Sequence, residues 1–323
     1  MEKRLKWGII GLGKIANKFA ADLRLSETAV LHAVASRSHQ KANEFAHKYE
    51  SVKAYGSYDA LVKDPEVDVV YVATPHVFHF EITMMCLEHG KHVLCEKPMG
   101  MNAVQVGEMM ALAKKKGLFL MEGIWTRFHP STQKVLELIN RGTVGEINHL
   151  RADFGFAAAF DPEKRLFNKS LGGGSLLDVG LYPVYLSLQL LGKPQSIAAQ
   201  ARFTQTGVDD FCTMAFDYGN KVKAHLESSL AINTSTEAYI VGTEGAIKLH
   251  SRFHECKRIS LFKNGEESTF DFEIKGNGYI YEIDEVNRCI SQGKAESEKL
   301  PLTLSLTLSY TLDLILSEIR LEY

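Results

Sequence analysis

The chain has 323 residues, of which 45% are hydrophobic and 24% charged, and its formal net charge is −2 at pH 7. This length suits two domains, and the composition is typical of a soluble globular protein. The small net charge gives no electrostatic reason to expect nucleic acid or an anionic membrane as a partner. Polar residues interrupt every apolar run before it reaches the length of a membrane span, and no signal-type apolar core follows the start. We therefore expect a cytoplasmic protein.

The first part of the chain alternates apolar runs with segments of helical pattern. The apolar runs predict strands at residues 5–10, 29–35, 67–73, 92–95 and 118–121. Helical patterns, three of them opened by a serine or asparagine cap, lie at residues 15–25, 38–49, 57–61, 80–89 and 102–116. This alternation predicts a Rossmann domain, a doubly wound parallel sheet, over residues 1–123.

The pattern changes after residue 123. A predicted helix at residues 131–140 precedes strand-like stretches at residues 147–156, 196–204, 211–217, 222–230, 238–241, 246–249, 259–262 and 269–274. Predicted helices at residues 279–291 and 303–318 close the chain. The order predicts a second α/β domain over residues 124–323, with a large, mostly antiparallel open sheet. One face of this sheet is expected to rest on helices and the other to be exposed.

The five cysteines are scattered, which favours reduced, buried thiols over a disulfide framework. One spacing, Cys86-x-x-His89-x-x-His92-x-x-Cys95, is similar to that of a zinc site. Gly90, however, separates a predicted helix from a predicted strand on which His92 and Cys95 point to opposite faces. Four zinc ligands must converge on one point, so we expect no metal here.

A glycine-rich turn follows the first predicted strand. Its sequence, Gly11-x-Gly13-x-x-Ala16, fits the dinucleotide fingerprint. Gly11 permits the tight turn, Gly13 lets a pyrophosphate approach the backbone, and Ala16 allows close helix packing. The helix start around Lys14 and Ile15 would present unpaired amides and a positive dipole end to the phosphates. These five residues are therefore candidates for binding a nicotinamide dinucleotide.

The end of the second predicted strand indicates which dinucleotide is bound. A site that prefers NAD usually places Asp or Glu there to hold the ribose 2′-hydroxyl. This chain has Ser36 and Arg37 instead, and a guanidinium can pair with a 2′-phosphate. The alternative is a solvated arginine in a loop. We expect NADP as the cofactor, with NAD as the less favoured choice.

Ligands of open parallel sheets bind at the carboxyl ends of the strands. Two further predicted strands end in chemically useful residues, and the candidates for cofactor binding there are Thr74, Pro75, His76, Glu96 and Lys97. Lys97 lies in an apolar neighbourhood, where a lysine can lower the pKa of a neighbour or lose its own proton through desolvation. Pro98 is a candidate for a cis peptide bond. His79 could bind the substrate or the lysine. The simpler alternatives are a surface lysine in a turn and packed or solvated histidines.

A second glycine-rich segment, Gly172-Gly173-Gly174, leads to Asp178 and Tyr182. These two residues are four apart, so on one helix they share a face, although Pro183 would kink that helix. A tyrosine near a lysine and a carboxylate is a plausible proton donor and acceptor for a carbonyl/carbinol pair. The alternative is a structural helix with a buried Tyr–Asp hydrogen bond.

These segments, in this order, resemble the Gfo/Idh/MocA family, which includes glucose–fructose oxidoreductase and inositol dehydrogenase. The resemblance covers nearly the whole chain and rests on Gly11-x-Gly13-x-x-Ala16, Thr74-Pro75-x-x-x-His79, Glu96-Lys97-Pro98 and Gly172 through Gly180. Many members have a histidine at the position of Tyr182. The tyrosine, together with the segments Met121–Phe128 and Arg165–Asn168, is similar to the branch of dimeric dihydrodiol dehydrogenases.

The resemblance implies a Rossmann domain, a second domain with a large open sheet, and a homodimer formed through that sheet. It implies proton transfer by Lys97, Asp178 and Tyr182. It also implies an aromatic substrate pocket that includes Trp125 and Phe154, with Arg165 as a further substrate-binding residue. Ordinary core packing is the alternative for Trp125.

The sequence thus predicts an NADP-dependent oxidoreductase acting on a secondary alcohol or carbonyl of a cyclic diol, sugar or dicarbonyl. One alternative is an NADP(H)-sensing regulatory protein of the same fold without turnover. A sensor needs no proton relay, so the set of Lys97, Asp178 and Tyr182 argues against it. Another alternative is a protein with a tightly bound cofactor that serves internal redox cycling.

Overall fold

The computed structural model describes residues 4–323, which form two compact units. The first unit comprises the chain up to Phe128 together with Ile274–Leu306. The second comprises His129–Glu273 and Thr307–Tyr323. The boundary predicted after residue 123 lies close to the first crossing between the units. The return of Ile274–Leu306 to the first unit had no counterpart in the sequence pattern.

The first unit contains a six-stranded parallel sheet with the order β3-β2-β1-β4-β5-β6. This order is that of a Rossmann sheet, as predicted. The strands are β1 (Leu5–Ile10), β2 (Ala29–Ala35), β3 (Lys53–Tyr55), β4 (Val69–Val72), β5 (His92–Glu96) and β6 (Leu120–Gly123).

Three helices of this unit begin where the sequence places capping residues. The side chains of Ser38, Ser57 and Asn102 accept hydrogen bonds from backbone amides in the first turns of α2, α3 and α5. The helices are α1 (Lys14–Leu23), α2 (His39–Tyr49), α3 (Tyr58–Val62), α4 (His79–Glu88), α5 (Ala103–Lys116) and α8 (Ile280–Ser291). The remaining helix, α9 (Leu302–Glu318), starts in the first unit and runs into the second.

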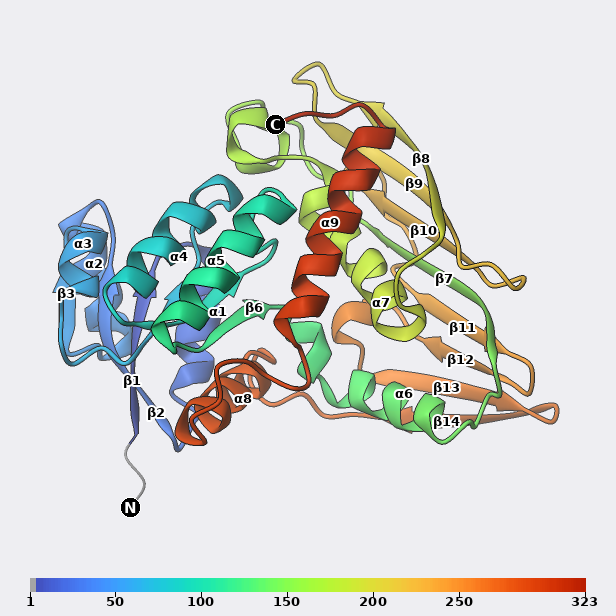
Figure 1. The fold of residues 1–323 in the computed structure, drawn as a ribbon, viewed down its shortest axis with the longest axis horizontal. Coiled ribbons are helices and arrows are strands. Elements are labelled where there is room, and N and C mark those ends of the chain that lie inside the picture. The colour runs from blue at the N-terminus through green and yellow to red at the C-terminus, as the bar shows by residue number, and fades with distance from the viewer. Residues whose placement is uncertain (1–3) are drawn as a thin grey trace. The chain divides into compact units, whose positions relative to one another are not determined.

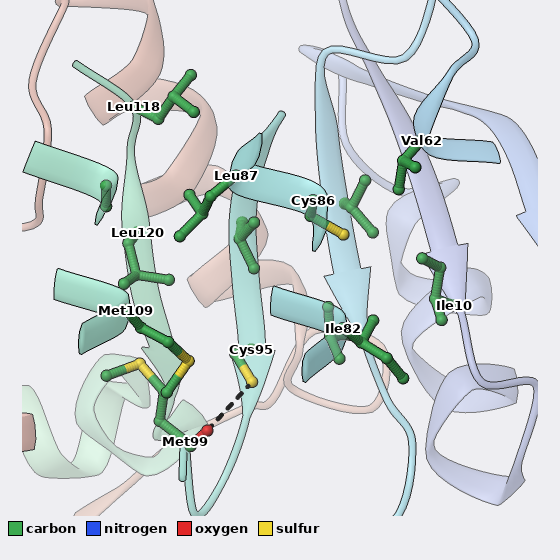
Figure 2. Close-up of a cluster of buried hydrophobic side chains, with 14 of the residues drawn as sticks. Ile10, Val62, Ile82, Cys86, Leu87, Cys95, Met99, Met109, Leu118 and Leu120 are labelled. Atoms are coloured by element: carbon green, nitrogen blue, oxygen red, sulfur yellow. Dashed lines mark hydrogen bonds between the residues drawn. The ribbon is translucent and has the colours of Figure 1, made fainter. Parts of the chain in front are cut away.

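A fully apolar cluster fills the space between one face of the parallel sheet and the helices α3, α4 and α5 (Figure 2). Ile10 and Cys95 point into it from the sheet, while Ile82 and Met109 come from the helices. The Cys95 thiol donates a long hydrogen bond of 3.7 Å to the Met99 carbonyl. Because alternate residues of β1 and β4 point to the other face, Trp7, Ile9 and Tyr71 contribute to a second layer of packing.

The second unit contains an eight-stranded sheet with the order β14-β13-β12-β11-β7-β10-β9-β8. Every pair is antiparallel except β7 and β10, which confirms the predicted mostly antiparallel sheet. The strands are β7 (Ile147–Gly155), β8 (Ser196–Phe203), β9 (Asp209–Asp217), β10 (Lys223–Ser229), β11 (Ala238–Gly242), β12 (Ala246–Leu249), β13 (Arg258–Lys263) and β14 (Glu266–Asp271). The helices α6 (Pro130–Asn140) and α7 (Leu181–Leu191) lie on one side of this sheet (Figure 1).

The structure departs from the predicted elements in two places. The strand β3 was not predicted, because Lys53–Tyr55 is a short edge segment without an apolar run. Residues Leu176–Gly180 form a π-helix, which sequence periodicity does not reveal. All five cysteines are buried free thiols, as predicted. Within residues 4–323, no helix combines the length and the apolar character needed to cross a bilayer.

The carboxylate of Asp22 attaches α8 to the Rossmann core. It accepts hydrogen bonds from the backbone amides of Asn277, Tyr279 and Ile280 at 2.8–3.3 Å, although it belongs to α1. These amides precede or begin α8 and have no carbonyl partner within their own helix. Asp22 therefore caps a helix that lies more than 250 residues away in the sequence.

We expect Asp22→Ala to lower the free energy of unfolding by about 3 kcal/mol, because three backbone donors lose a charged acceptor. Denaturant titration followed by circular dichroism would measure the change. Replacement of the exposed Glu44 on α2 by alanine provides the control and should change stability by less than about 0.5 kcal/mol. An equal loss in both variants would contradict a capping role for Asp22.

Candidate active site

The turn after β1 can be made only with glycine. Gly11 has a φ of +90°, and a Cβ there would lie 2.7 Å from the Ala73 carbonyl and 2.8 Å from the Thr74 nitrogen. At Gly13, in contrast, a Cβ would meet nothing within 4 Å. The backbone at Gly13 is thus open to a ligand, whereas Ala16 is fully buried against the sheet. Both features are those that a dinucleotide requires of this turn.

The N-terminus of α1 offers an anion-binding site to such a ligand. Gly13 caps the helix without any side-chain hydrogen bond, and the first turn contains no acidic residue. The cationic side chain of Lys14 and the apolar side chain of Ile15 are both exposed there. Unpaired amides and the helix dipole favour a phosphate at this position.

Arg37 follows the end of β2 and is exposed. Burial raises the pKa of the nearby Tyr58, and the Arg37 guanidinium partly offsets that effect. The hydroxyl oxygen of Ser36 accepts a hydrogen bond from the Ser38 amide at 3.2 Å, which orders this turn. The segment presents a cation and hydroxyl groups in place of a carboxylate. This donor set fits a 2′-phosphate better than a free 2′-hydroxyl.

His79 joins the ends of two strands. Its imidazole is fully buried, with Nδ1 2.7 Å from the Pro98 carbonyl oxygen and Nε2 2.7 Å from the Thr74 carbonyl oxygen. Both ring nitrogens therefore face the backbone, and the histidine fixes the loop after β4 to the loop after β5. The Lys97–Pro98 peptide bond in the second loop is cis. His76 is also buried, and its ring centroid lies 5.9 Å from that of His79.

Glu96 precedes Lys97 in a group of buried acids and phenols. The Tyr71 hydroxyl donates a hydrogen bond to Glu96, and the Tyr71 ring stacks on Phe19 with centroids 3.7 Å apart. Burial, together with the nearby Glu96 carboxylate, raises the pKa of Tyr71 well above its ordinary value. Glu282 at the start of α8 is fully buried, and burial and Glu96 likewise raise its pKa well above the usual range. Burial therefore favours the protonated form of Glu282.

Trp125 lies in the first unit and stacks on Tyr279, with ring centroids 4.7 Å apart and an angle of 9° between the planes. It is 7% exposed. Tyr279 immediately precedes α8, and its amide is one of those that donate to Asp22. The position of the indole therefore depends on the same contact that attaches α8 to the core.

The glycine-rich segment of the second unit is held from two sides. A Cβ on Gly173 would lie 2.6 Å from the Arg165 carbonyl oxygen, which explains the need for glycine there. The next residues are fixed by the buried Asp209, whose Oδ2 accepts hydrogen bonds from the Ser175 hydroxyl at 2.6 Å and the Leu176 amide at 2.8 Å. Burial raises the pKa of Asp209, and these two donors partly offset that effect.

Asp178 lies on the π-helix Leu176–Gly180, and Tyr182 lies in the first turn of α7, which continues it. Pro183 has no amide hydrogen, and the Leu181 amide bonds to the Leu176 carbonyl five residues back, so the backbone widens by one residue before α7 starts. The Asp178 carboxylate forms an ion pair with Arg165 at 2.8 Å. The sequence placed Arg165 among substrate ligands and did not indicate this pair.

Two rings lie against the Tyr182 side chain. The Phe154 centroid lies 5.6 Å from that of Tyr182, and the His254 centroid lies 5.2 Å from it. Phe154 and His254 are themselves stacked at 4.1 Å. His254 is 3% exposed and belongs to a short helical turn between β12 and β13. No motif surrounds His254, so it could not be predicted as a site residue from the sequence.

The predicted site residues thus form two groups. The predicted cofactor-binding residues, with His79 and Trp125, belong to the first unit, whereas Phe154, Arg165, Asp178 and Tyr182 belong to the second. The proposed proton-transfer set draws on both groups, since Lys97 is in the first. Within the described chain, the cysteines and histidines of the zinc-like spacing are not grouped, and the one group of possible ligand atoms is His32, Asp64 and Glu66.

Comparison with known proteins identifies the family of the chain and supports its two-part organisation. A family model described as an oxidoreductase family with an NAD-binding Rossmann fold matches residues 5–124, and a Gfo/Idh/MocA C-terminal domain model matches residues 132–248. The trans-1,2-dihydrobenzene-1,2-diol dehydrogenase of Mus musculus is 39% identical, covering 96% of this chain and 95% of that protein. The Homo sapiens enzyme of that name is 38% identical, covering 98% and 96%.

Solved structures share the fold over the full length. A variant of a 3-ketoreductase from Actinomadura kijaniata, in complex with NADP, has a TM-score of 0.90 at 23% identity and covers 99% of both chains. The aldose-aldose oxidoreductase from Caulobacter crescentus has a TM-score of 0.90 at 24% identity and covers 98% of both chains. At this level of identity the similarity concerns the fold.

We expect Gly173→Ala to lower the free energy of unfolding by about 1–3 kcal/mol, because the new methyl group meets two backbone carbonyls that cannot rotate away. Chemical denaturation would measure it. Gly107→Ala in α5 is the matched control, since a Cβ there meets nothing within 4 Å. That change should be neutral or stabilising because alanine favours helix. A Gly173→Ala protein as stable as the wild type would contradict the crowding at this turn.

Proposed function

Because the chain belongs to the Gfo/Idh/MocA family of oxidoreductases, we propose that it transfers a hydride between NADP and a secondary alcohol or carbonyl. The substrate class is a cyclic diol, a sugar or a dicarbonyl. The proposal is carried by similarity over nearly the whole chain to dihydrodiol dehydrogenases, at 37–39% identity. It is further supported by the presence of Lys97, Asp178 and Tyr182 in the expected order.

The first unit supplies residues that fit the cofactor. The turn at Gly11 and Gly13 and the open amides of α1 would hold the pyrophosphate, and Ser36 and Arg37 would hold the 2′-phosphate. When bound, NADP supplies the nicotinamide carbon that accepts or gives the hydride. Thr74, Pro75, His76 and Glu96 are the proposed contacts near the nicotinamide end, because they follow the carboxyl ends of β4 and β5 or lie within β5.

The proposed proton transfer uses Tyr182 as general acid and base. An ordinary tyrosine has a pKa of about 10, so it needs a nearby positive charge to release its proton at neutral pH. Lys97 would supply this charge, and Asp178 would orient the pair. The Arg165 ion pair favours an ionised, ordered Asp178. The proton leaves the substrate hydroxyl as the hydride departs in oxidation, and it returns to the carbonyl oxygen in reduction.

The proposed substrate contacts are Trp125, Phe154 and Arg165. Phe154 and His254 present ring faces next to Tyr182, and such faces suit the apolar side of a cyclic diol or sugar. His79, which the sequence analysis placed with these residues, has both nitrogens against backbone carbonyls. We therefore assign it to positioning the Lys97 loop and add His254 to the substrate contacts.

We also propose that the protein is a cytoplasmic homodimer formed through the eight-stranded sheet. A hollow of about 680 Å³ lies on this sheet and is lined by residues of β7, β8, β9 and β10, including the exposed Arg151, Thr213 and His225. A second copy of the chain would cover this hollow. Light scattering coupled to size-exclusion chromatography would measure the mass, and a monomer at micromolar concentration would contradict the dimer.

Turnover with NADP⁺ and with NAD⁺ on D-xylose, D-glucose, myo-inositol and a trans-dihydrodiol, and reduction of a diacetyl-type dicarbonyl by NADPH, tests the reaction. We expect activity with NADP⁺ or NADPH on at least one member of this panel. Saturable NADPH binding without turnover on any of them would favour the sensing alternative instead.

We expect Lys97→Met to retain NADPH binding and to lower kcat by about 10²–10⁴-fold, because the Tyr182 proton loses its stabilising cation. NADPH titration by tryptophan fluorescence and steady-state kinetics would separate the two effects. Lys115→Met, which removes an exposed lysine of α5, is the control and should leave both unchanged. Full activity of Lys97→Met would refute the assigned role.

We expect Arg37→Ala to raise the KM for NADP⁺ by about 10–100-fold, because a charge-assisted pair with the 2′-phosphate is lost. The KM for NAD⁺ should change little, since NAD⁺ lacks that phosphate. Arg141→Ala, which removes the exposed arginine directly after α6, is the matched control. A parallel rise of both KM values would contradict 2′-phosphate recognition by Arg37.

A further inference from the structure

Glu122 lies on β6, the strand beside the one that leads to Lys97. In the parallel pairing of β5 and β6 it stands opposite Cys95, two residues before Lys97. Its side chain is 3% exposed, and its Oε1 accepts a hydrogen bond from the Met99 amide at 2.8 Å. The carboxyl group therefore holds the backbone of the loop that carries Lys97 from the neighbouring strand.

The groups around Glu122 favour opposite protonation states. Burial raises its pKa to about 7, and the Glu96 carboxylate acts in the same direction. The Ser305 hydroxyl, the Met99 amide and the positive charge of Lys97 favour the ionised form and partly offset the effect of burial. A further ionisable neighbour is Cys95, whose thiol has a pKa raised well above its ordinary value by burial, so it carries no charge at neutral pH.

We propose that Glu122 is a positioning residue for Lys97. Its ionised carboxylate fixes the loop that carries Lys97 through the Met99 amide and places a negative charge near the lysine. This inference rests on the function proposed above for Lys97. Lys97 stays protonated as the pH falls, so the acid-side change is in the hydrogen bond from the Met99 amide, which is stronger to an ionised acceptor. The form with Lys97 held in place therefore has Glu122 ionised. Protonation of Glu122 removes the negative charge beside Lys97 and weakens the acceptor of the Met99 amide.

The sign of the pH dependence follows from this role. Above about pH 7 Glu122 is ionised and turnover is high, and below it Glu122 is protonated and turnover falls. Glutamine mimics the protonated form, because it keeps an oxygen acceptor for the Met99 amide and has no charge. Glu122→Gln should therefore resemble the wild type at pH 6 and be about tenfold slower at pH 8. Glu122→Asp keeps the carboxylate and should restore the pH dependence.

A matched control is available in Glu282. This acid is also fully buried and lies near Glu96, but its two oxygens make no hydrogen bond to the Lys97 loop. Glu282→Gln should preserve the wild-type pH profile. If Glu282→Gln removes the fall of turnover below about pH 7 as Glu122→Gln does, a general effect of buried charge explains the result. The proposal is then overturned.

A second readout does not depend on turnover. The chain has nine methionines, so ¹⁵N-methionine labelling gives a simple amide spectrum in which a Met99→Leu variant assigns Met99. We expect the Met99 amide shift to titrate near pH 7 in the wild type and to be independent of pH in Glu122→Gln. The Met101 amide, which bonds to Gln105 Oε1 at 2.9 Å, is the internal reference and should not move.

The outcomes separate this inference from the proposed function. A Met99 amide that does not titrate, or an acid limb that persists in Glu122→Gln, overturns the role of Glu122. Wild-type protein without turnover on any substrate of the panel contradicts the proposed function, and with it the catalytic consequence drawn for Glu122. Two observations support the role: the titration of the Met99 amide and the fall of turnover below about pH 7. Both should disappear in Glu122→Gln and both should remain in Glu282→Gln.

Discussion

The parallel pairing of β1, β4, β5 and β6 is the constraint on which the functional part of the first unit depends. Parallel strands bring their carboxyl ends to one edge, so Gly11, Thr74, Lys97 and Glu122 come close together although they span more than 100 residues. The fully buried His79 then links two of these ends through their carbonyl groups. With this edge fixed, the dinucleotide turn and the Lys97 loop have few conformations left.

The buried carboxyl groups of the first unit show how differently such groups are accommodated. Asp22 receives several backbone donors and caps a helix. The two oxygens of Glu282 find no hydrogen-bond partner among residues 4–323, and burial raises its pKa and favours the protonated form. An ionised, unpaired carboxylate in a dry interior would cost several kcal/mol, which protonation avoids. Glu122 lies between these cases, because one amide and one lysine favour its charge while burial opposes it. It is thus able to change protonation within the pH range in which the enzyme would work.

Elements with strong local signals could be predicted from the sequence. Ser38, Ser57 and Asn102 cap the predicted helices, and β1 and β2 have the predicted bounds, because capping and apolar runs act over a few residues. The edge strand β3 is too short and polar to produce such a run. The contacts that determine the site are not local: Asp178 pairs with Arg165, His79 reaches Pro98, and Phe154 stacks on His254. Only the folded chain shows which of many polar residues become partners.

The second unit holds Asp178 and Tyr182, the proposed proton-transfer residues, on a backbone that buried hydrogen bonds fix. At the start of the π-helix the Asp209 carboxylate accepts hydrogen bonds from the Ser175 hydroxyl and the Leu176 amide. The Ser175 hydroxyl also lies 2.9 Å from the Ser228 hydroxyl. These contacts are buried, so they hold the π-helix without any contribution from a ligand. Arg165 then fixes the Asp178 carboxylate from the solvent side. Groups oriented before the substrate arrives need no reorganisation when charge develops, and this is where an enzyme gains most of its electrostatic stabilisation. The widened turn at Leu176–Gly180 is therefore better understood as a support for Asp178 and Tyr182 than as an irregularity of α7.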